Sequence, residues 1–286
     1  MPLTTLLAAT DFSDGGDHAL QRACQLAAEH GAALTVLHVV ALSEEREQAW
    51  LPRELALPES DVSGLQDLLR ERIDRLCRHA PPVHTAIRRG RASALITDSA
   101  AEAQLIVLGM HGANRWMDGL IGSTAERVLH RARQPVLAVR QPPQEAYRRV
   151  VIATDFSPYS ARALAAAAQL APQAELHLLH VHHHWYTYRQ PTHAEHVPEN
   201  APHILEQAAQ APLHALLERA GVEAARVRLH LRLGHPAAEI TSFAAGLGAD
   251  LVAGGTRGYS HAAGILLGST SAGLLRGTKS DMLLCP

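Results

Sequence analysis

The chain has 286 residues, enough for two domains of ordinary size, and its formal net charge of -2 at pH 7 argues against a basic nucleic-acid-binding face. Its 3 cysteines are scattered and odd in number, so the sequence indicates neither a disulfide framework nor a cysteine-based zinc site. Residues 1–30 lack the basic head and apolar core of a signal peptide, and the longest apolar runs are too short to span a bilayer, so we expect a cytoplasmic protein with no membrane partner.

Strand and helix patterns alternate through the first half of the chain. An apolar run at 3–9 predicts a strand, and Ser13 is placed to cap a helix over 14–30. Strands that alternate with helices indicate a parallel sheet with helices on both faces and ligand loops at the carboxyl ends of its strands. Further strands are expected at 34–40, 83–89, 104–108 and 136–140, and further helices at about 64–79 and at 91–102 and 123–133.

The second half of the chain repeats the first, which indicates tandem domains. The segment at 6–27, LLAATDFSDGGDHALQRACQLA, matches VIATDFSPYSARALAAAAQLA at 151–171. Similarly, LIVLGMHG matches LVAGGTRG, and LIGSTAERVL matches LLGSTSAGLL. Because two prolines interrupt the stretch between the copies, we predict domains at 1–140 and 148–286 with a linker at 141–147. The second copy has Ser-Asp-Met where the first has Gln-Pro-Val before its last strand, which weakens the pattern for that strand.

Each copy carries two glycines after a strand and, after nine intervening residues, Gly-Ser-Thr before a helix. Glycine lets the backbone approach an anion closely, and a helix N-terminus offers unpaired N–H groups, so this pattern predicts a phosphate site. The alternative is that the glycines only form turns and that Ser123 only caps its helix. Asp11 and Asp155 end the first strand of each copy. A carboxylate there can accept hydrogen bonds from a ribose or an adenine, or can simply fix the turn.

The ATDFS and LHVV segments and the G-x2-G-x9-G-S/T pattern together resemble the universal stress protein family in its tandem two-domain form. The resemblance implies two Rossmann-like (adenine nucleotide α-hydrolase-like) α/β domains, each with a five-stranded parallel sheet in the order 3-2-1-4-5. It also implies binding of ATP, ADP or AMP, with Mg²⁺ as a possible companion, in a stress-response module. The binding positions that it implies in the first domain are Thr10, Asp11, Val39, Gly109, His111, Gly112, Gly122, Ser123 and Thr124. Those in the second domain are Thr154, Asp155, Val181, Gly255, Arg257, Gly258, Gly268, Ser269 and Thr270.

A histidine-rich stretch follows the second strand of the second copy. His180, His182 and His184 would share one face if the strand continued through them, which predicts a zinc site. The alternative is that His180, like His38 in the first copy, is a strand position and that the others belong to a polar loop.

The usual machinery of ATP hydrolysis is missing, because Lys279, the only lysine, lacks the glycine spacing of a P-loop. No Ser-His-Asp set recurs in both copies, so we name no catalytic residue. We expect both nucleotide sites to form, and Arg257 favours the second. The alternatives are a slow ATP-hydrolysing enzyme and a ligand-free scaffold with zinc. Single-domain relatives dimerise through their last strands, so 136–140 and 282–286 are expected to pair within one chain as a pseudo-dimer, with a homodimer as the alternative.

Overall fold

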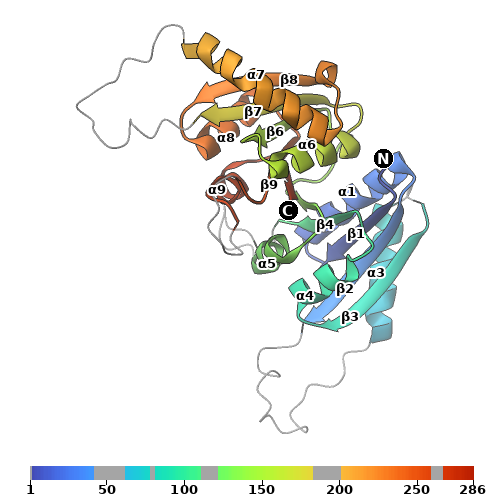
Figure 1. Ribbon diagram of the computed structural model, residues 1–286. Helices are drawn as coiled ribbons and strands as arrows, with labels where there is room; N and C mark the ends of the chain where they lie inside the picture. Colours follow the sequence, from blue (N-terminus) through green and yellow to red (C-terminus); the bar gives the residue numbers. More distant parts are fainter. Residues whose placement is uncertain (1, 42–61, 78–80, 111–121, 183–200, 259–266) are drawn as a thin grey trace, which may run out of the picture. The chain divides into compact units, whose positions relative to one another are not determined.

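Helices and strands alternate within each half of the described chain, and two strands, Val136–Val139 and Arg149–Thr154, follow one another where the halves meet (Figure 1). The computed structural model describes residues 2–41, 62–77, 81–110, 122–182, 201–258 and 267–286. The chain divides into two compact units, residues 1–144 (unit 1) and 145–286 (unit 2). Each unit is a parallel sheet covered by helices, so the α/β fold class predicted from the alternation is confirmed.

Unit 1 has its strands in the order β3-β2-β1-β4-β5, and all neighbouring pairs are parallel. Helix α1 packs against α3, and α4 packs against α5, so the two pairs cover the two faces of the sheet. The elements are β1 (Thr5–Thr10), α1 (Asp14–His30), β2 (Ala33–Ala41), α3 (Val62–Leu76), β3 (Val83–Gly90), α4 (Ala92–Ser99), β4 (Leu105–Gly109), α5 (Ser123–Arg131) and β5 (Val136–Val139).

Unit 2 repeats this order as β8-β7-β6-β9-β10, again with parallel pairs throughout. Both units therefore have the 3-2-1-4-5 order that the family resemblance implied. The elements are β6 (Arg149–Thr154), α6 (Pro158–Leu170), β7 (Glu175–His182), α7 (Ala201–Ala220), a 3-10 turn (Ala224–Arg226), β8 (Val227–Leu233), α8 (Pro236–Leu247), β9 (Leu251–Gly255), α9 (Ser269–Gly277) and β10 (Asp281–Cys285).

The first helix of each unit begins at a serine cap, which confirms the prediction made for Ser13. The Ser13 hydroxyl accepts a hydrogen bond from the Gly16 N–H at 3.1 Å, and the Ser157 hydroxyl accepts one from the Ser160 N–H at 3.3 Å. These bonds satisfy one of the amide groups that a helix leaves unpaired at its start. The strand before each helix is apolar and largely buried, as expected for a strand covered on both faces. The end of the first strand and the start of the first helix are thereby held in a fixed relation.

The last strand of unit 2 forms despite its weaker sequence pattern. Leu283 and Leu284 are fully buried in β10, which pairs with β9 along its length. Asp281 begins the strand with its side chain buried, and the hydroxyl of Tyr147 donates to its Oδ2 at 2.7 Å. A buried carboxylate is tolerated when such hydrogen bonds replace those of water. Tyr147 thus supports the start of this strand.

Cys24 and Cys77 form a disulfide, so the expectation that the cysteines make no such bond is wrong. Cys24 lies in α1, and Cys77 follows directly after α3. Because these two helices pack together on one face of the sheet, the Cα atoms of the two cysteines are 5.4 Å apart, within the range that a disulfide requires. Cys285 remains a free thiol, and its burial raises its pKa to about 12.

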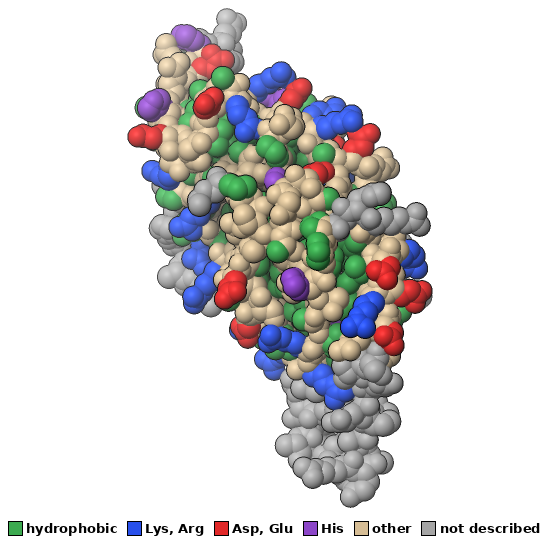
Figure 2. All heavy atoms as spheres, turned by 90° about the vertical axis from the view of Figure 1, so that its right-hand side faces the viewer, with side chains coloured by type: hydrophobic (Ala, Val, Ile, Leu, Met, Phe, Trp, Pro, Cys, Tyr) green, Lys and Arg blue, Asp and Glu red, His purple; other side chains and the backbone are tan. Residues whose placement is uncertain are grey.

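The surface of the described residues carries charges of both signs. On the face shown in Figure 2, Lys and Arg side chains are interspersed with Asp and Glu side chains. Within the described ranges, no helix combines the length and the apolar character needed to cross a membrane.

Candidate functional site

A hollow of about 350 Å³ opens in unit 1 at the carboxyl ends of β1, β2 and β4. Every described residue that the resemblance implied for this domain lines it. His111 and Gly112 lie outside the described residues. The implied residues along its wall are Thr10, Asp11, Val39, Gly109, Gly122, Ser123 and Thr124.

Unit 2 has a corresponding hollow of about 270 Å³ at the carboxyl ends of β6, β7 and β9. All nine residues implied for the second domain line it: Thr154, Asp155, Val181, Gly255, Arg257, Gly258, Gly268, Ser269 and Thr270. The duplication seen in the sequence therefore brings two equivalent sets of side chains together, one in each unit.

Part of the wall of each hollow is apolar. In unit 1 it is formed by Leu37 and Val39 from β2 and by Ile96 from α4. In unit 2, Val181 and Ile240 occupy the matching places. An apolar slot of this kind accepts a flat heterocycle, because burial of its faces removes apolar surface from water.

Another part of the wall is formed by a helix N-terminus. Gly122 is the N-cap of α5 and Gly268 is the N-cap of α9, and neither helix has a side-chain cap hydrogen bond. The interpretation of Ser123 as a plain cap is therefore wrong, since Ser123 is the first residue inside the helix. Ser123 and Thr124 are exposed at this part of the hollow. Uncapped N–H groups and the positive end of the helix dipole favour an anion here.

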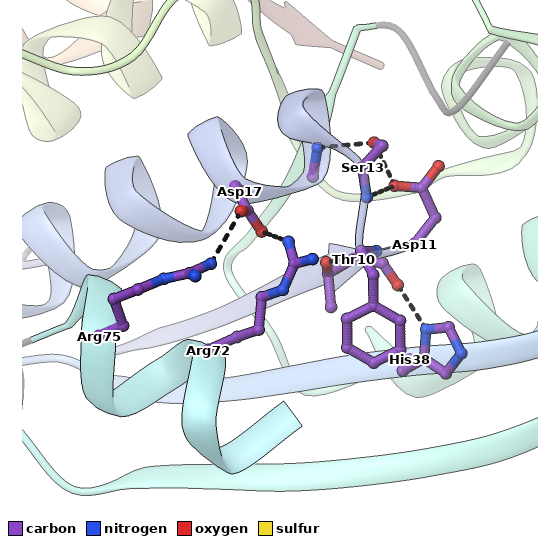
Figure 3. A network of polar contacts seen from close by, with 9 residues as sticks. Thr10, Asp11, Ser13, Asp17, His38, Arg72 and Arg75 are labelled. Atoms are coloured by element: carbon purple, nitrogen blue, oxygen red, sulfur yellow. Dashed lines mark hydrogen bonds and ion pairs between the residues drawn. The ribbon is translucent and has the colours of Figure 1, made fainter. Parts of the chain in front are cut away.

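The aspartate lines the hollow at the end of β1, which lies between β2 and β4 in the sheet, and it sits on a turn held by its own residues (Figure 3). The Ser13 N–H donates to Asp11 Oδ1 at 3.1 Å, and the Phe12 N–H donates to the Thr10 hydroxyl at 3.1 Å. The backbone of Phe12 has φ of 62°, in the left-handed region that residues other than glycine rarely adopt. Such a backbone persists only where its surroundings enforce it, and it often marks a functional turn.

The same turn recurs in unit 2. The Ser157 N–H donates to Asp155 Oδ1 at 3.0 Å, and the Phe156 N–H donates to the Thr154 hydroxyl at 2.9 Å. Phe156 also has φ of 62°. A Cβ on Gly258 would lie 2.7 Å from Asp155 Oδ2, so the absence of a side chain at this position leaves room for the carboxylate.

A histidine packs behind each of these turns. His38 Nδ1 lies 2.9 Å from the carbonyl oxygen of Thr10, and its ring centroid is 4.2 Å from that of Phe12. His180 makes the same 2.9 Å contact with the Thr154 carbonyl, and its ring is 4.7 Å from that of Phe156. A carbonyl oxygen can only accept, so Nδ1 carries the proton in both rings. Burial lowers the pKa of His180 below 6.5, against the opposing effect of this hydrogen bond.

The predicted zinc ligands do not come together as a metal site among the described residues. His180 uses Nδ1 on the backbone, and its ring centroid is 6.4 Å from that of the exposed His182. His184 lies outside the described residues. Within the described ranges, no group of three His, Cys, Asp or Glu side chains could hold a metal ion.

The two hollows differ beside the aspartate turn. Ser160 of unit 2 accepts a hydrogen bond from the Thr154 hydroxyl at 3.0 Å and donates one to the Ser157 carbonyl at 2.9 Å. The equivalent position in unit 1, likewise six residues after the threonine of the ATDFS motif, is Gly16. A Cβ at Gly16 would lie 2.8 Å from Asp11 Oδ1, so the Asp11 carboxylate leaves no room for a side chain here, and unit 1 lacks the bracing hydroxyl of unit 2.

Sequence reasoning did not identify the lining residues contributed by α4 and α8. Ala92 and Ile96 line the first hollow, and Pro236 and Ile240 line the second. Both pairs fall within the matching segments IRRGRASALI and LRLGHPAAEI. The repeat itself was therefore the signal that could have identified them.

The family model described as "Universal stress protein family" matches residues 2–140 and again residues 146–286. The chain belongs to the universal stress protein family. It is 27% identical over 186 residues to a universal stress protein of Mycolicibacterium smegmatis, a match that covers 62% of this chain and 63% of that protein. The matched part thus spans less than two thirds of that relative. A universal stress protein A homolog of Coxiella burnetii is 29% identical over 140 residues, covering 47% of this chain and 94% of that protein.

Solved structures show the same universal stress protein fold over nearly the whole chain. A universal stress protein from Archaeoglobus fulgidus superposes with a TM-score of 0.70 at 22% identity, covering 98% of this chain and 97% of that one. A putative universal stress protein from Pseudomonas aeruginosa gives a TM-score of 0.68 at 18% identity, covering 99% and 93%. At these identities the similarity is one of fold.

Proposed function

We propose that each unit of this universal stress protein binds one adenine nucleotide, and that the protein serves as a nucleotide-responsive module in a stress response. The observation that carries the proposal is the set of groups that lines each hollow. Apolar side chains, a fixed carboxylate and an uncapped helix N-terminus border the same space in both units, and the strand that ends at the aspartate lies between the other two strands of the site.

This set of groups fits the three parts of a nucleotide. The slot beside Val39 and Ile96 takes the base, and the carboxylate of Asp11 accepts hydrogen bonds from ribose hydroxyls. The N-terminus of α5 takes the phosphates, with the hydroxyls of Ser123 and Thr124 as further donors. In unit 2, Arg257 lines the hollow and adds a cation that can pair with a phosphate. A Mg²⁺ ion would accompany a bound triphosphate through the phosphate oxygens.

Replacement of the N-cap glycines of α5 and α9 tests the proposal without disturbing the fold. Gly268 has φ of -55°, and a Cβ there would meet its nearest atom at 3.5 Å, an ordinary contact. The side chain of Gly268→Val would therefore enter the hollow while the backbone stays in place. Gly122 has a similar backbone, with φ of -58°, so Gly122→Val is the matching change in unit 1.

Calorimetric titration of the full chain with ATP measures the result. We expect two sites in the wild-type protein, one site in each single variant and none in the double variant. Gly246→Ala is the matched control, because a Cβ there meets nothing within 4 Å and lies away from both hollows. The proposal is wrong if the wild type shows no saturable binding, or if the double variant binds as the wild type does.

The same samples separate the alternatives. Phosphate release that is faster than in buffer and disappears in Asp11→Ala and Asp155→Ala variants would indicate an ATP-hydrolysing enzyme. Zinc in untagged protein without nucleotide would indicate a ligand-free scaffold. Pairing of the two last strands as a pseudo-dimer stays a prediction, and sedimentation of the full chain tests the homodimer alternative.

A further inference from the structure

We propose that Cys24 and Cys77 form a reversible oxidation site on unit 1. A hydroperoxide oxidises the two thiols to the disulfide, and a low-molecular-weight thiol reduces the disulfide by attack on Cys77. This role goes beyond nucleotide binding and does not depend on it. Three observations carry it: the unequal burial of the two sulfur-bearing residues, the hollow in front of one of them, and the contacts that the bond secures.

The two cysteines differ in accessibility. Cys24 lies on the buried face of α1 and is 4% exposed, whereas Cys77 is partly exposed where α3 ends. A hollow of about 500 Å³ lies against Cys77 and has Arg70, Asp74 and Thr85 on its wall. Thiol–disulfide exchange requires a thiolate to approach along the sulfur–sulfur axis, so access decides which sulfur is attacked. The hollow therefore makes Cys77 the sulfur that an external thiol reaches.

Reduction of the Cys24–Cys77 disulfide consumes two thiols. The first thiolate bonds to Cys77 Sγ, the bond between the cysteines breaks, and Cys24 leaves as a thiolate that takes up a proton. A second thiol then displaces the first from Cys77, so that Cys77 becomes a thiol and the reductant leaves as its own disulfide. The protein gains two electrons and two protons.

The oxidation runs through the same accessible sulfur. The Cys77 thiolate attacks the hydroperoxide, which leaves as an alcohol, or as water if the oxidant is hydrogen peroxide, and Cys77 becomes a sulfenic acid. Cys24 then attacks this sulfur and the oxygen leaves as water. The partner thiol lies close enough for this second step because the two Cα atoms are 5.4 Å apart.

The bond joins the end of α3 to α1. Figure 3 shows that Arg72 and Arg75 of α3 reach Asp17 of α1 beside the aspartate turn. Arg72 of α3 forms an ion pair with Asp17 of α1, and its guanidinium carbon lies 5.7 Å from the centroid of the Phe12 ring. Arg75 lies 3.4 Å from the same carboxylate. Oxidation therefore fixes the helix whose side chains support the turn that carries Asp11.

The chain provides two internal comparisons. Ala168 occupies in unit 2 the place of Cys24, each lying fourteen residues after the threonine of the ATDFS motif, so α6 and α7 are packed without such a bond. Cys285 is fully buried and its burial raises its pKa to about 12, which keeps it protonated and unreactive.

Mass spectrometry of the full chain tests the site. The reduced protein is treated with one equivalent of hydrogen peroxide and then alkylated under denaturing conditions. We expect the peptides of Cys24 and Cys77 to be cross-linked and Cys285 to be alkylated. Glutathione added to the oxidised Cys24→Ala variant, in which Cys77 carries the sulfenic acid, should form a mixed disulfide on Cys77. Alanine at position 24 matches the residue of unit 2, so the fold is expected to tolerate it.

Two further measurements use the wild-type protein itself. Under native conditions, iodoacetamide should modify Cys77 of the reduced protein about tenfold faster than Cys24, as the difference in access requires. Hydrogen exchange should be faster in α3 after reduction and unchanged in α7. Faster modification of Cys24 than of Cys77, a cross-link to Cys285, or equal exchange of α3 in both states would each overturn the proposal.

Discussion

The carbonyl group of Gly15 lies so close to Gly109 that no side chain fits between β4 and the start of α1. A Cβ placed on Gly109 would lie 2.5 Å from the carbonyl oxygen of Gly15 and 3.1 Å from the N–H nitrogen of Gly16. Both neighbours belong to the backbone at the start of α1, so neither can rotate away. The lack of a side chain at Gly109 therefore serves mainly to let β4 pack against α1, and it affects the hollow through that packing.

Gly109→Ala is expected to lower the free energy of unfolding by about 1–3 kcal/mol, the usual range for overpacking a tight interior. Urea unfolding followed by circular dichroism measures the change. Gly246→Ala serves as the control, because it adds a methyl group in open space within a helix and should leave the free energy unchanged or raise it by up to about 1 kcal/mol. Equal changes in the free energy of unfolding for the two variants would show that the close approach at Gly109 places no limit on the size of the residue there.

Replacement of His38 should release the aspartate turn of unit 1. His38→Ala removes the hydrogen bond to the Thr10 carbonyl and the ring that packs on Phe12, whose backbone is held at φ of 62°. We expect a loss of about 2 kcal/mol in the free energy of unfolding. His84→Ala, which changes an exposed histidine of β3, is the control and should alter stability by less than about 0.5 kcal/mol. A smaller loss for His38→Ala than for the control would contradict the supporting role of the ring.

Unit 2 should lose stability in mild acid. Burial lowers the pKa of both His180 and His230 below 6.5, and the nearby His177 also lowers that of His230. The unfolded chain therefore binds protons at these rings before the folded chain does. The stabilising contribution is complete above pH 6.5 and is lost as the pH falls from that value toward the lowered pKa values.

Urea unfolding at about pH 7.5 and about pH 5.5 measures this dependence. The wild type should lose more stability between the two conditions than a variant carrying His180→Gln and His230→Gln, which has no imidazole at either position. An identical loss in both proteins would mean that other groups govern the acid response.

Tyr147→Phe should destabilise unit 2 by about 1–3 kcal/mol, because it removes a donor from the buried carboxylate of Asp281. A double-mutant cycle with Asp281→Ala, which leaves no acceptor for the Tyr147 hydroxyl, isolates the pair from the effect of each single change. A coupling free energy near zero would show that the 2.7 Å contact does not support β10.

The redox state of unit 1 should change its affinity for nucleotide, a prediction that rests on the proposed function. In the Gly268→Val background only unit 1 is expected to bind, so reduction of the disulfide should weaken the measured binding several-fold. Arg72→Gln should produce a similar weakening in the oxidised protein, because Arg72 joins α3 to Asp17 and Phe12. Unchanged affinity in both cases would separate the oxidation site from the nucleotide site.

Reduction should also lower the stability of unit 1, since the disulfide closes a loop between residues 53 positions apart. Chain-entropy arguments give about 4 kcal/mol as the upper value. Thermal unfolding with and without a phosphine reductant measures it, and the Cys24→Ala variant should show no difference between the two conditions.

The sequence predicted the parts of this fold that depend on local pattern and on repetition. Apolar strands, serine caps and the duplicated glycines are visible because each recurs at a fixed place in both copies. The Cys24–Cys77 bond was not predictable, because it depends on how α1 and α3 pack and has no counterpart in the second copy. The left-handed backbone of Phe12 was also hidden, since nothing in a phenylalanine indicates positive φ. The close approach of Gly109 to Gly15 joins segments that are distant in the sequence, so its cause is apparent only in three dimensions.

Gly16 in one copy and Ser160 in the other make the two hollows of one chain unequal. A homodimer of single domains would have two identical hollows, and both would fill over one narrow range of ligand concentration. Here the two hollows differ, and every polypeptide carries one of each. If both hollows bind nucleotide as proposed, a rising concentration of nucleotide would produce an intermediate form with one site filled, so one molecule would report three ranges of nucleotide concentration.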